Sequence, residues 1–297
     1  MISDKAESNL LTLQHSIETA KNWPRKADRS IVREGAPHVF RGWLLPFLVS
    51  IDDALWGRWD YWARTKISGR LLDEPLPRIS FGDFPMSKLG HSPARRMLEN
   101  ALNHIPSHGE WQTWGSTTYI DYFFDWMLYG FGYHAELPEA PIGCEGACSR
   151  LYQTFCLDAM QAYPYDYFGD MLAETSYGRG QGFYPTPMHV CEMMTQMLYG
   201  EGDSRALTIN EPCVGTGRML MCASNFSMCL FGQDIMLTSV KATIINLYLY
   251  APWGAKPMEW MIPEREEMPE RTPLPVPRIA WKNIRRHGIS QAELILT

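Results

Sequence analysis

One stretch of this 297-residue chain decides its fold, and it reads Asn210-Glu211-Pro212-Cys213-Val214-Gly215-Thr216-Gly217-Arg218-Met219-Leu220. The two glycines follow a short apolar strand predicted over 206–209 and precede a helix predicted over 218–224. Glycines at the end of a first strand let the backbone turn tightly beneath a ligand and start a helix whose free N–H groups face it. The stretch therefore predicts a ligand-binding loop.

The residues that follow place an acid beside this loop. A second short strand is predicted over 228–232 and a second helix over 236–249, and Asp234 stands 19 residues after Gly215. An acid at the end of the second strand can accept hydrogen bonds from ribose hydroxyls. Strand, glycine turn, helix, strand and helix form the opening half of a doubly wound sheet. The preceding Glu-Pro, the two strands and Asp234 favour a ligand site over a simple turn.

The residues that precede the loop form a second motif, Arg179-Gly180-Gln181-Gly182-Phe183-Tyr184-Pro185-Thr186-Pro187-Met188-His189-Val190. A helix opened by proline is predicted over 187–199. Its apolar spacing predicts five side chains turned inward. These are Val190, Met193, Met194, Met197 and Leu198.

Together these motifs resemble the N6-adenine DNA methyltransferases, most closely the modification subunits of type I restriction systems. Their S-adenosylmethionine loop reads D/E-P-x-C/A-G-T-G-x-x-L, which residues 211–220 follow with Val214 at the usual Cys or Ala position. Their R-G-Q-F/Y-Y/F-T-P-x-x-V is similar to residues 179–190 with small insertions, and their G-x-E/D-I matches residues 232–235. The resemblance covers residues 166–250.

The resemblance implies S-adenosylmethionine as cofactor and nine residues around it. They are Phe183, Tyr184, Thr186, Pro187, Glu211, Gly215, Gly217, Asp234 and Ile235. Thr186 and Pro187 would border the methionine moiety, with Phe183 or Tyr184 packed nearby. Glu211, Gly215 and Gly217 would form the cofactor loop. Asp234 would bind the ribose, and Ile235 would lie against the adenine ring.

One departure from the family is decisive for chemistry. These enzymes need an N/D-P-P-Y/F motif, which binds the target amino group and stacks on the flipped base. This chain contains no Pro-Pro dipeptide, so no catalytic residue is predicted. Only 47 residues follow Tyr250, too few for the strands that remain in a seven-stranded sheet. The predicted fold is α/β, an incomplete Rossmann-like S-adenosylmethionine-dependent methyltransferase fold preceded by a mainly helical N-terminal region.

Three regions are predicted along the chain. Residues 1–165 are mainly helical, with helices over 8–21, 43–65 and 151–163 and an aromatic stretch over 119–129 that is typical of a core. Residues 166–262 form the methyltransferase-like domain, and residues 263–297 form a proline-rich tail. The tail contains a small basic group, residues 282–287, that either contacts phosphate or is a solvated helix end.

The charge pattern bears on partners. The formal net charge is −6, but residues 97–178 carry one base, Arg150, against eleven acids. This acidic segment is either a solvated surface or a face for a basic partner, as in a decoy of nucleic acid. DNA contact would have to come from local basic residues, such as Arg25 and Lys26 or Arg285 and Arg286.

Composition excludes several classes of protein. The chain is 45% hydrophobic, which excludes intrinsic disorder, and it has neither a signal peptide nor an apolar run long enough to span a membrane. Seven cysteines, an odd number, predict reduced thiols in the cytoplasm. Cys144 and Cys148 lack the second ligand pair of a zinc site, so no metal is predicted.

Three readings of the function remain open, and one of them is a purely structural relative in which the cofactor pocket is vestigial. The other two are functional. The first is a divergent N6-adenine DNA methyltransferase-like protein that binds S-adenosylmethionine and associates with DNA or restriction–modification machinery, active alone or when a second protein chain completes it. The second is a catalytically silent relative that binds or regulates protein partners.

Overall fold

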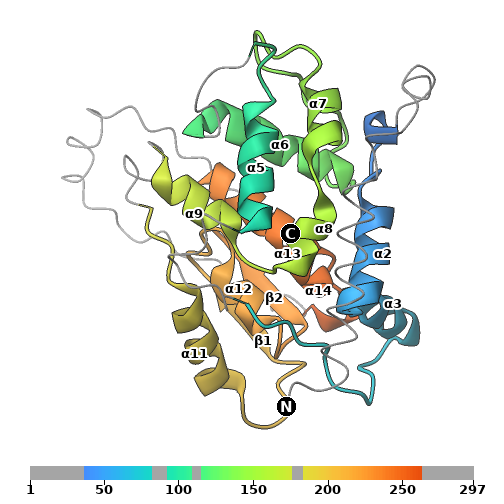
Figure 1. Ribbon diagram of the computed structural model, residues 1–297. Coiled ribbons are helices and arrows are strands. Elements are labelled where there is room, and N and C mark those ends of the chain that lie inside the picture. The colour runs from blue at the N-terminus through green and yellow to red at the C-terminus, as the bar shows by residue number, and fades with distance from the viewer. Residues whose placement is uncertain (1–36, 82–91, 109–114, 176–182, 263–297) are drawn as a thin grey trace, which may run out of the picture.

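The computed structural model describes residues 37–81, 92–108, 115–175 and 183–262, which form a helical body beside a small parallel sheet (Figure 1). The described residues up to 175 contribute helices only. They are η3 (Pro37–Val39), α2 (Leu45–Leu55), α3 (Arg58–Ser68), α5 (Pro93–Asn103), α6 (Thr117–Gly130), α7 (Ala147–Thr154), α8 (Leu157–Ala162) and α9 (Tyr167–Glu174). The second part alternates helices and strands. They are α11 (Met188–Tyr199), β1 (Thr208–Glu211), α12 (Arg218–Ala223), β2 (Cys229–Gly232), α13 (Leu237–Tyr250), α14 (Pro252–Ala255) and η5 (Glu259–Met261).

The sheet confirms the pattern predicted around the glycine loop. β1 and β2 are parallel, in a register that pairs Ile209 with Leu230 and Glu211 with Gly232. The strands and the helices α11, α12 and α13 begin and end within two residues of their predicted bounds. Within the described ranges the sheet has these two strands and no more. This is the opening half of a doubly wound fold, and a complete Rossmann-like sheet is not formed there.

Helix α13 is the centre of the molecule. Twelve of its fourteen residues are buried, so neighbouring elements cover it on all sides. The main hydrophobic cluster joins it to α2, α5, α6, α8 and α9, running from Leu44 to Tyr250. The core therefore crosses the predicted boundary at residue 165. Ile209 of β1 and Leu230 of β2 lie in a second, smaller cluster, which also includes Tyr61 of α3. The three predicted regions themselves stay a prediction.

Three N-terminal predictions can be compared with the structure. The aromatic stretch 119–129 lies in α6 with most of its rings buried, which confirms it as core. The single helix predicted over 43–65 is wrong, because Gly57 adopts a left-handed φ of 70° and separates α2 from α3. The helix predicted over 151–163 is also interrupted, since Phe155 and Cys156 are extended between α7 and α8.

The predicted orientation of α11 is wrong. Its buried residues are Met188, Cys191 and Thr195, whereas four of the five side chains predicted inward are exposed. These are Met193, Met194, Met197 and Leu198. The prediction followed the most apolar stripe of the helix, but α11 packs on α12 through smaller residues.

A buried cation, Arg58, joins the helical body to the two helices that follow the strands. The Arg58 guanidinium, fully buried on α3, donates to the Ser224 hydroxyl (2.8 Å) and the Tyr250 carbonyl (2.5 Å), at the ends of α12 and α13. It also lies over the Trp253 ring at 5.0 Å. Burial lowers the pKa of Arg58 to about 9. Arg58 thus fixes the ends of the two helices that follow the strands.

Several predictions lie outside the described residues. They concern the helix over 8–21, Arg25, Lys26, residues 179–182, Arg285, Arg286 and the whole tail 263–297. In the described part of the chain, no helix is both long enough and apolar enough to cross a membrane.

Candidate cofactor site

The glycine loop after β1 has a conformation that only glycine adopts easily. Gly215 and Gly217 have φ values of 55° and 91°, in the left-handed region. A Cβ on Gly217 would lie 3.1 Å from Thr243 Cγ2, so Gly217 also allows the loop to pack closely on α13. A Cβ on Gly215 would meet the Phe183 ring at 3.5 Å and no other atom within 4 Å. Gly215 therefore leaves its ligand-facing side open apart from Phe183.

Hydrogen bonds from α13 hold the loop in place. The Thr243 hydroxyl donates to the Gly215 carbonyl, and the Asn246 amide donates to the Thr216 carbonyl, each at 2.8 Å. At the other end, the Val214 amide donates to the Gln233 carbonyl at 2.9 Å. The loop is thus fixed both to the helix behind it and to the end of β2.

Asp234 joins the ends of the two strands. Its Oδ2 accepts from the Gly215 amide and its Oδ1 from the Met236 amide, both at 2.9 Å. Each carboxylate oxygen has a second lone pair, so the half-buried side chain can still accept a hydroxyl of a ligand. The predicted meeting of the acid and the glycine loop is what the structure contains.

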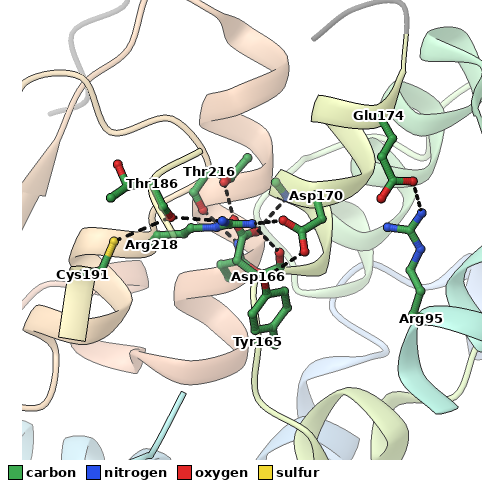
Figure 2. A network of polar contacts seen from close by, with 11 residues as sticks. Arg95, Tyr165, Asp166, Asp170, Glu174, Thr186, Cys191, Thr216 and Arg218 are labelled. Carbon is green, nitrogen blue, oxygen red and sulfur yellow. Dashed lines mark hydrogen bonds and ion pairs between the residues drawn. The ribbon is translucent and has the colours of Figure 1, made fainter. Parts of the chain in front are cut away.

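Behind the loop lies a buried network centred on Asp166, the residue before α9 (Figure 2). Its Oδ1 accepts from the Gly169 amide (2.9 Å) and the Asn246 amide (2.8 Å). Its Oδ2 accepts from the Thr216 hydroxyl (2.5 Å) and from Arg218 Nε (2.7 Å). All four bonds involve a carboxylate that is fully buried, so each lone-pair direction is used.

Arg218 extends this network to the segment before α11. It donates to Asp170 Oδ1 at 2.5 Å and to the Thr186 carbonyl at 3.0 Å (Figure 2). Burial alone would lower the pKa of Arg218, but attraction to Asp166 and Asp170 raises it above the ordinary value. Arg218 is therefore a permanent buried cation that holds Thr186 beside the glycine loop.

A match with a known family covers this part of the chain. Residues 159–252 match the family model described as N-6 DNA Methylase. The matched residues make up about a third of the chain and are similar to that family. The match begins just before Asp166 and ends after α13, so it includes the loop, Asp234 and the buried network. No curated protein and no solved structure matches the chain.

The nine residues predicted around the cofactor occupy one region of the N-6 DNA methylase segment. Glu211, Gly215, Gly217 and Asp234 form the ends of the two strands and the loop between them. Phe183 packs toward Gly215, and Thr186 with Pro187 follows on the chain that Arg218 holds.

Two of the nine are large apolar side chains in solvent. Tyr184 is 85% exposed and Ile235 is 92% exposed. Ile235 directly follows Asp234 at the end of β2, where a ligand on the strand ends would cover it.

The sequence prediction missed Asp166, Asp170 and Arg218. Asp166 and Asp170 are four residues apart and so lie on one side of α9. That spacing was a usable signal, but their common partner Arg218 is 48 residues further on and could be found only from the fold.

Three bases from elsewhere in the chain compensate part of the negative charge of the acidic segment 97–178. Six of its eleven acids form ion pairs with Arg95, Arg218 or Lys241, all outside the segment. They are Glu99, Asp121, Asp125, Asp166, Asp170 and Glu174. Its exposed charge is therefore smaller than the sequence indicates.

The described residues hold no cluster of three or more His, Cys, Asp or Glu suited to a metal ion. All seven cysteines are free thiols. Cys144 is buried and Cys148 is half-buried, where burial raises the pKa of the Cys148 thiol.

Proposed function

We propose that this chain binds S-adenosylmethionine on the glycine loop and acts as a divergent, N6-adenine DNA methyltransferase-like protein. One observation carries the proposal: Asp234 and Gly215, from the ends of neighbouring parallel strands, are joined at 2.9 Å beside an open glycine surface. Open α/β sheets bind ligands at the carboxyl ends of their strands. The family match over residues 159–252 supports the same class of ligand.

The residues around the loop fit the parts of this cofactor. The free lone pairs of Asp234 can accept the two ribose hydroxyls, and the exposed Ile235 can cover one face of the adenine ring. Phe183 and Tyr184, with Thr186 and Pro187, would border the methionine part. Glu211 would close the loop, where its carboxylate already accepts from the Cys213 amide at 3.3 Å. The cofactor supplies the transferable methyl group, and these residues bind and orient it.

The proposal includes association with DNA or with restriction–modification proteins in the cytoplasm. Seven free cysteines support a reducing compartment. The missing N/D-P-P-Y/F motif favours a second protein chain as the source of base recognition. The alternative function, a silent binding or regulatory protein, rests on that same absence in the sequence.

Calorimetric titration with S-adenosylmethionine tests cofactor binding. We expect a dissociation constant on the order of micromolar, a free energy of about −8 kcal/mol. Asp234→Ala and Gly215→Trp should each weaken binding at least about tenfold, a loss of roughly 1.4 kcal/mol. Asp203→Ala is the matched control, since Asp203 lies in the exposed turn before β1 and pairs only locally with Arg205. An absence of heat at about millimolar ligand would exclude cofactor binding.

Association with DNA is tested separately by duplex binding at several salt concentrations. Binding through phosphates should weaken steeply with salt, and charge reversal at Arg285 and Arg286, or at Arg25 and Lys26, should weaken it further. Transfer of labelled methyl groups to unmethylated DNA distinguishes an enzyme from the silent alternative. Methyl transfer by the pure chain would exclude the catalytically silent alternative. No transfer although the cofactor is bound would favour that alternative.

A further inference from the structure

Arg218 is a cation at a place in the fold that is unfavourable for one. It is the first residue of α12, where the free N–H groups of a helix carry a partial positive charge, and its side chain is only 6% exposed. Asp166 and Asp170 offset that cost with ion pairs of 2.7 and 2.5 Å. Buried ion pairs are often no more stabilising than apolar side chains of similar volume, so the guanidinium points to a role besides stability.

The Arg218 guanidinium reaches separate parts of the chain (Figure 2). Its Nε donates to Asp166 Oδ2 at 2.7 Å, and its Nη2 donates to Asp170 Oδ1 at 2.5 Å, both at the start of α9. Its Nη1 donates to the Thr186 carbonyl at 3.0 Å, in the segment that leads into α11. Because Arg218 directly follows the glycine loop, one side chain joins the loop, α9 and the segment 183–187.

The bond to Thr186 links the two walls of the candidate cofactor site. One wall is the glycine loop, and the other is the segment 183–187. In the described ranges, no other hydrogen bond connects this segment to the loop or to α12. The packing of α11 on α12 places the helix that follows, and the Arg218 bond places Thr186 in front of it. The spacing of the two walls therefore depends on Arg218.

Arg218 supports the site without being placed to contact a ligand. All three guanidinium nitrogens donate to protein acceptors, and the guanidinium carbon lies 5.5 Å from the centre of the Tyr165 ring. Because the guanidinium is planar, its bonds to the two carboxylates also fix the direction of Nη1 toward Thr186. A side chain locked in this way can hold a neighbouring group to within about 0.5 Å.

We infer that Arg218 is a positioning residue for the methionine half of S-adenosylmethionine. It holds Thr186 at the spacing from the glycine loop that this half requires, whereas the adenosine half depends on Asp234, which bonds to Gly215. The inference rests on the proposed cofactor site and goes beyond it by assigning the two halves of the ligand to separate supports. Arg218 should therefore determine how well the site distinguishes ligands that have an amino-acid part from ligands without one.

Calorimetric titration of the full chain with two ligands tests the inference. S-adenosylmethionine has both halves, and 5′-methylthioadenosine lacks the amino-acid part. Arg218→Lys keeps the positive charge beside Asp166 and Asp170, but an ammonium group cannot make the forked contact that also reaches Thr186. The variant should bind S-adenosylmethionine at least about tenfold more weakly, and its affinity for methylthioadenosine should stay within about twofold of that of the unmodified chain.

Arg205→Lys is the matched control. Arg205 also pairs with an acid and donates to backbone carbonyls, those of Leu72 and Glu74, but it lies in the turn before β1. Its replacement should leave both affinities unchanged.

A second variant keeps the test decisive if urea unfolding shows that Arg218→Lys does not fold. Asp170→Asn removes the charge of one anchor and leaves the guanidinium and Asp166 in place. It should weaken S-adenosylmethionine in preference to methylthioadenosine, by a smaller factor than Arg218→Lys.

The possible failures are distinguishable. Equal weakening of both ligands in the folded variant, or no weakening of either, would overturn the role of Arg218 and leave the cofactor site in place. An unmodified chain that binds neither ligand would overturn the cofactor site itself, and this inference with it.

Discussion

At the residue scale, Asp166 is the side chain on which the loop depends most. Its carboxylate receives bonds from Thr216, Arg218, Asn246 and Gly169, and no other described acid contacts so many parts of the site. Asp166→Ala should destabilise the fold by about 3–5 kcal/mol, because it leaves Arg218 buried with one carboxylate less. It should also weaken the binding of S-adenosylmethionine, because Thr216 and Asn246 lose the carboxylate to which they donate.

Urea unfolding and calorimetry on the same samples measure both effects. Asp203→Ala removes an exposed ion pair and should cost under about 1 kcal/mol. A loss of similar size in the two variants would refute a central role for Asp166.

Gly217 has both a positive φ and a close approach to Thr243, whereas Gly69 has a positive φ alone, so comparing the two separates these effects. Gly217→Ala should cost about 1–3 kcal/mol, from its positive φ and from the clash with Thr243. Gly69 also has a positive φ, 65°, but its Cβ would meet nothing within 4 Å. Gly69→Ala should therefore report the backbone cost alone and be the milder change, as judged by urea unfolding. Equal costs would show that close packing on α13 is unimportant.

Asp52 gives the molecule a dependence on pH. It is fully buried, its Oδ2 accepts from the Trp59 amide at 2.7 Å, and its Oδ1 has no partner in the described residues. Burial, opposed by that bond and by nearby Arg58, raises the pKa of Asp52 to about 6. The folded state thus favours the protonated form of Asp52. The stability that this group contributes is therefore fully present below about pH 4 and is lost as pH rises through 6.

The shift corresponds to a loss on the order of 3 kcal/mol between those limits. Asp52→Asn cannot ionise, so its urea midpoint should vary less over this interval than that of the unmodified chain. An identical pH profile in both proteins would assign the dependence to other groups.

At the element scale, α13 is the helix that both halves of the structure share. Ile245, fully buried in it, should cost about 2–5 kcal/mol on replacement by alanine. Ile67 on α3 is 87% exposed, and the same replacement there should cost less than about 0.5 kcal/mol. Chemical unfolding of both variants measures the contrast, and a small loss at Ile245 would contradict the central place of α13.

The elements also show what local sequence determines. The strands, the loop and α13 were predictable because the Gly215–Gly217 turn and Asp234 fix where each begins and ends. The division of α2 from α3 was not, since Gly57 in a helical pattern gives no sign of a left-handed φ. The outward face of α11 was not predictable either, because apolar spacing locates a face but not its partner.

At the scale of the whole molecule, one core joins the helical body and the N-6 DNA methylase segment. Since the main cluster runs from Leu44 to Tyr250, both parts should unfold in one transition. Loss of amide exchange protection at Trp59 and Trp126, in the helical body, should coincide with loss of protection at Ile209 and Leu230. Two separated transitions would show that the parts are independent domains.

The candidate site, too, could be predicted where its residues are close in sequence and not where they are far apart. Its loop and its acid came from adjacent motifs, but the buried support of the loop comes from α9, some 50 residues earlier. Such support is set by packing around α13, which no spacing in the sequence records. Only the fold brings Asp166 and Asp170 to Arg218.

The most direct test of the central claim is photochemical cross-linking of labelled S-adenosylmethionine, followed by mapping of the labelled peptides. The structure predicts label on the peptides that carry Phe183 to Pro187 or Ile235, removed by excess unlabelled cofactor and absent in Gly215→Trp. Label confined to other peptides, or unaffected by competition, would contradict a cofactor site on the glycine loop.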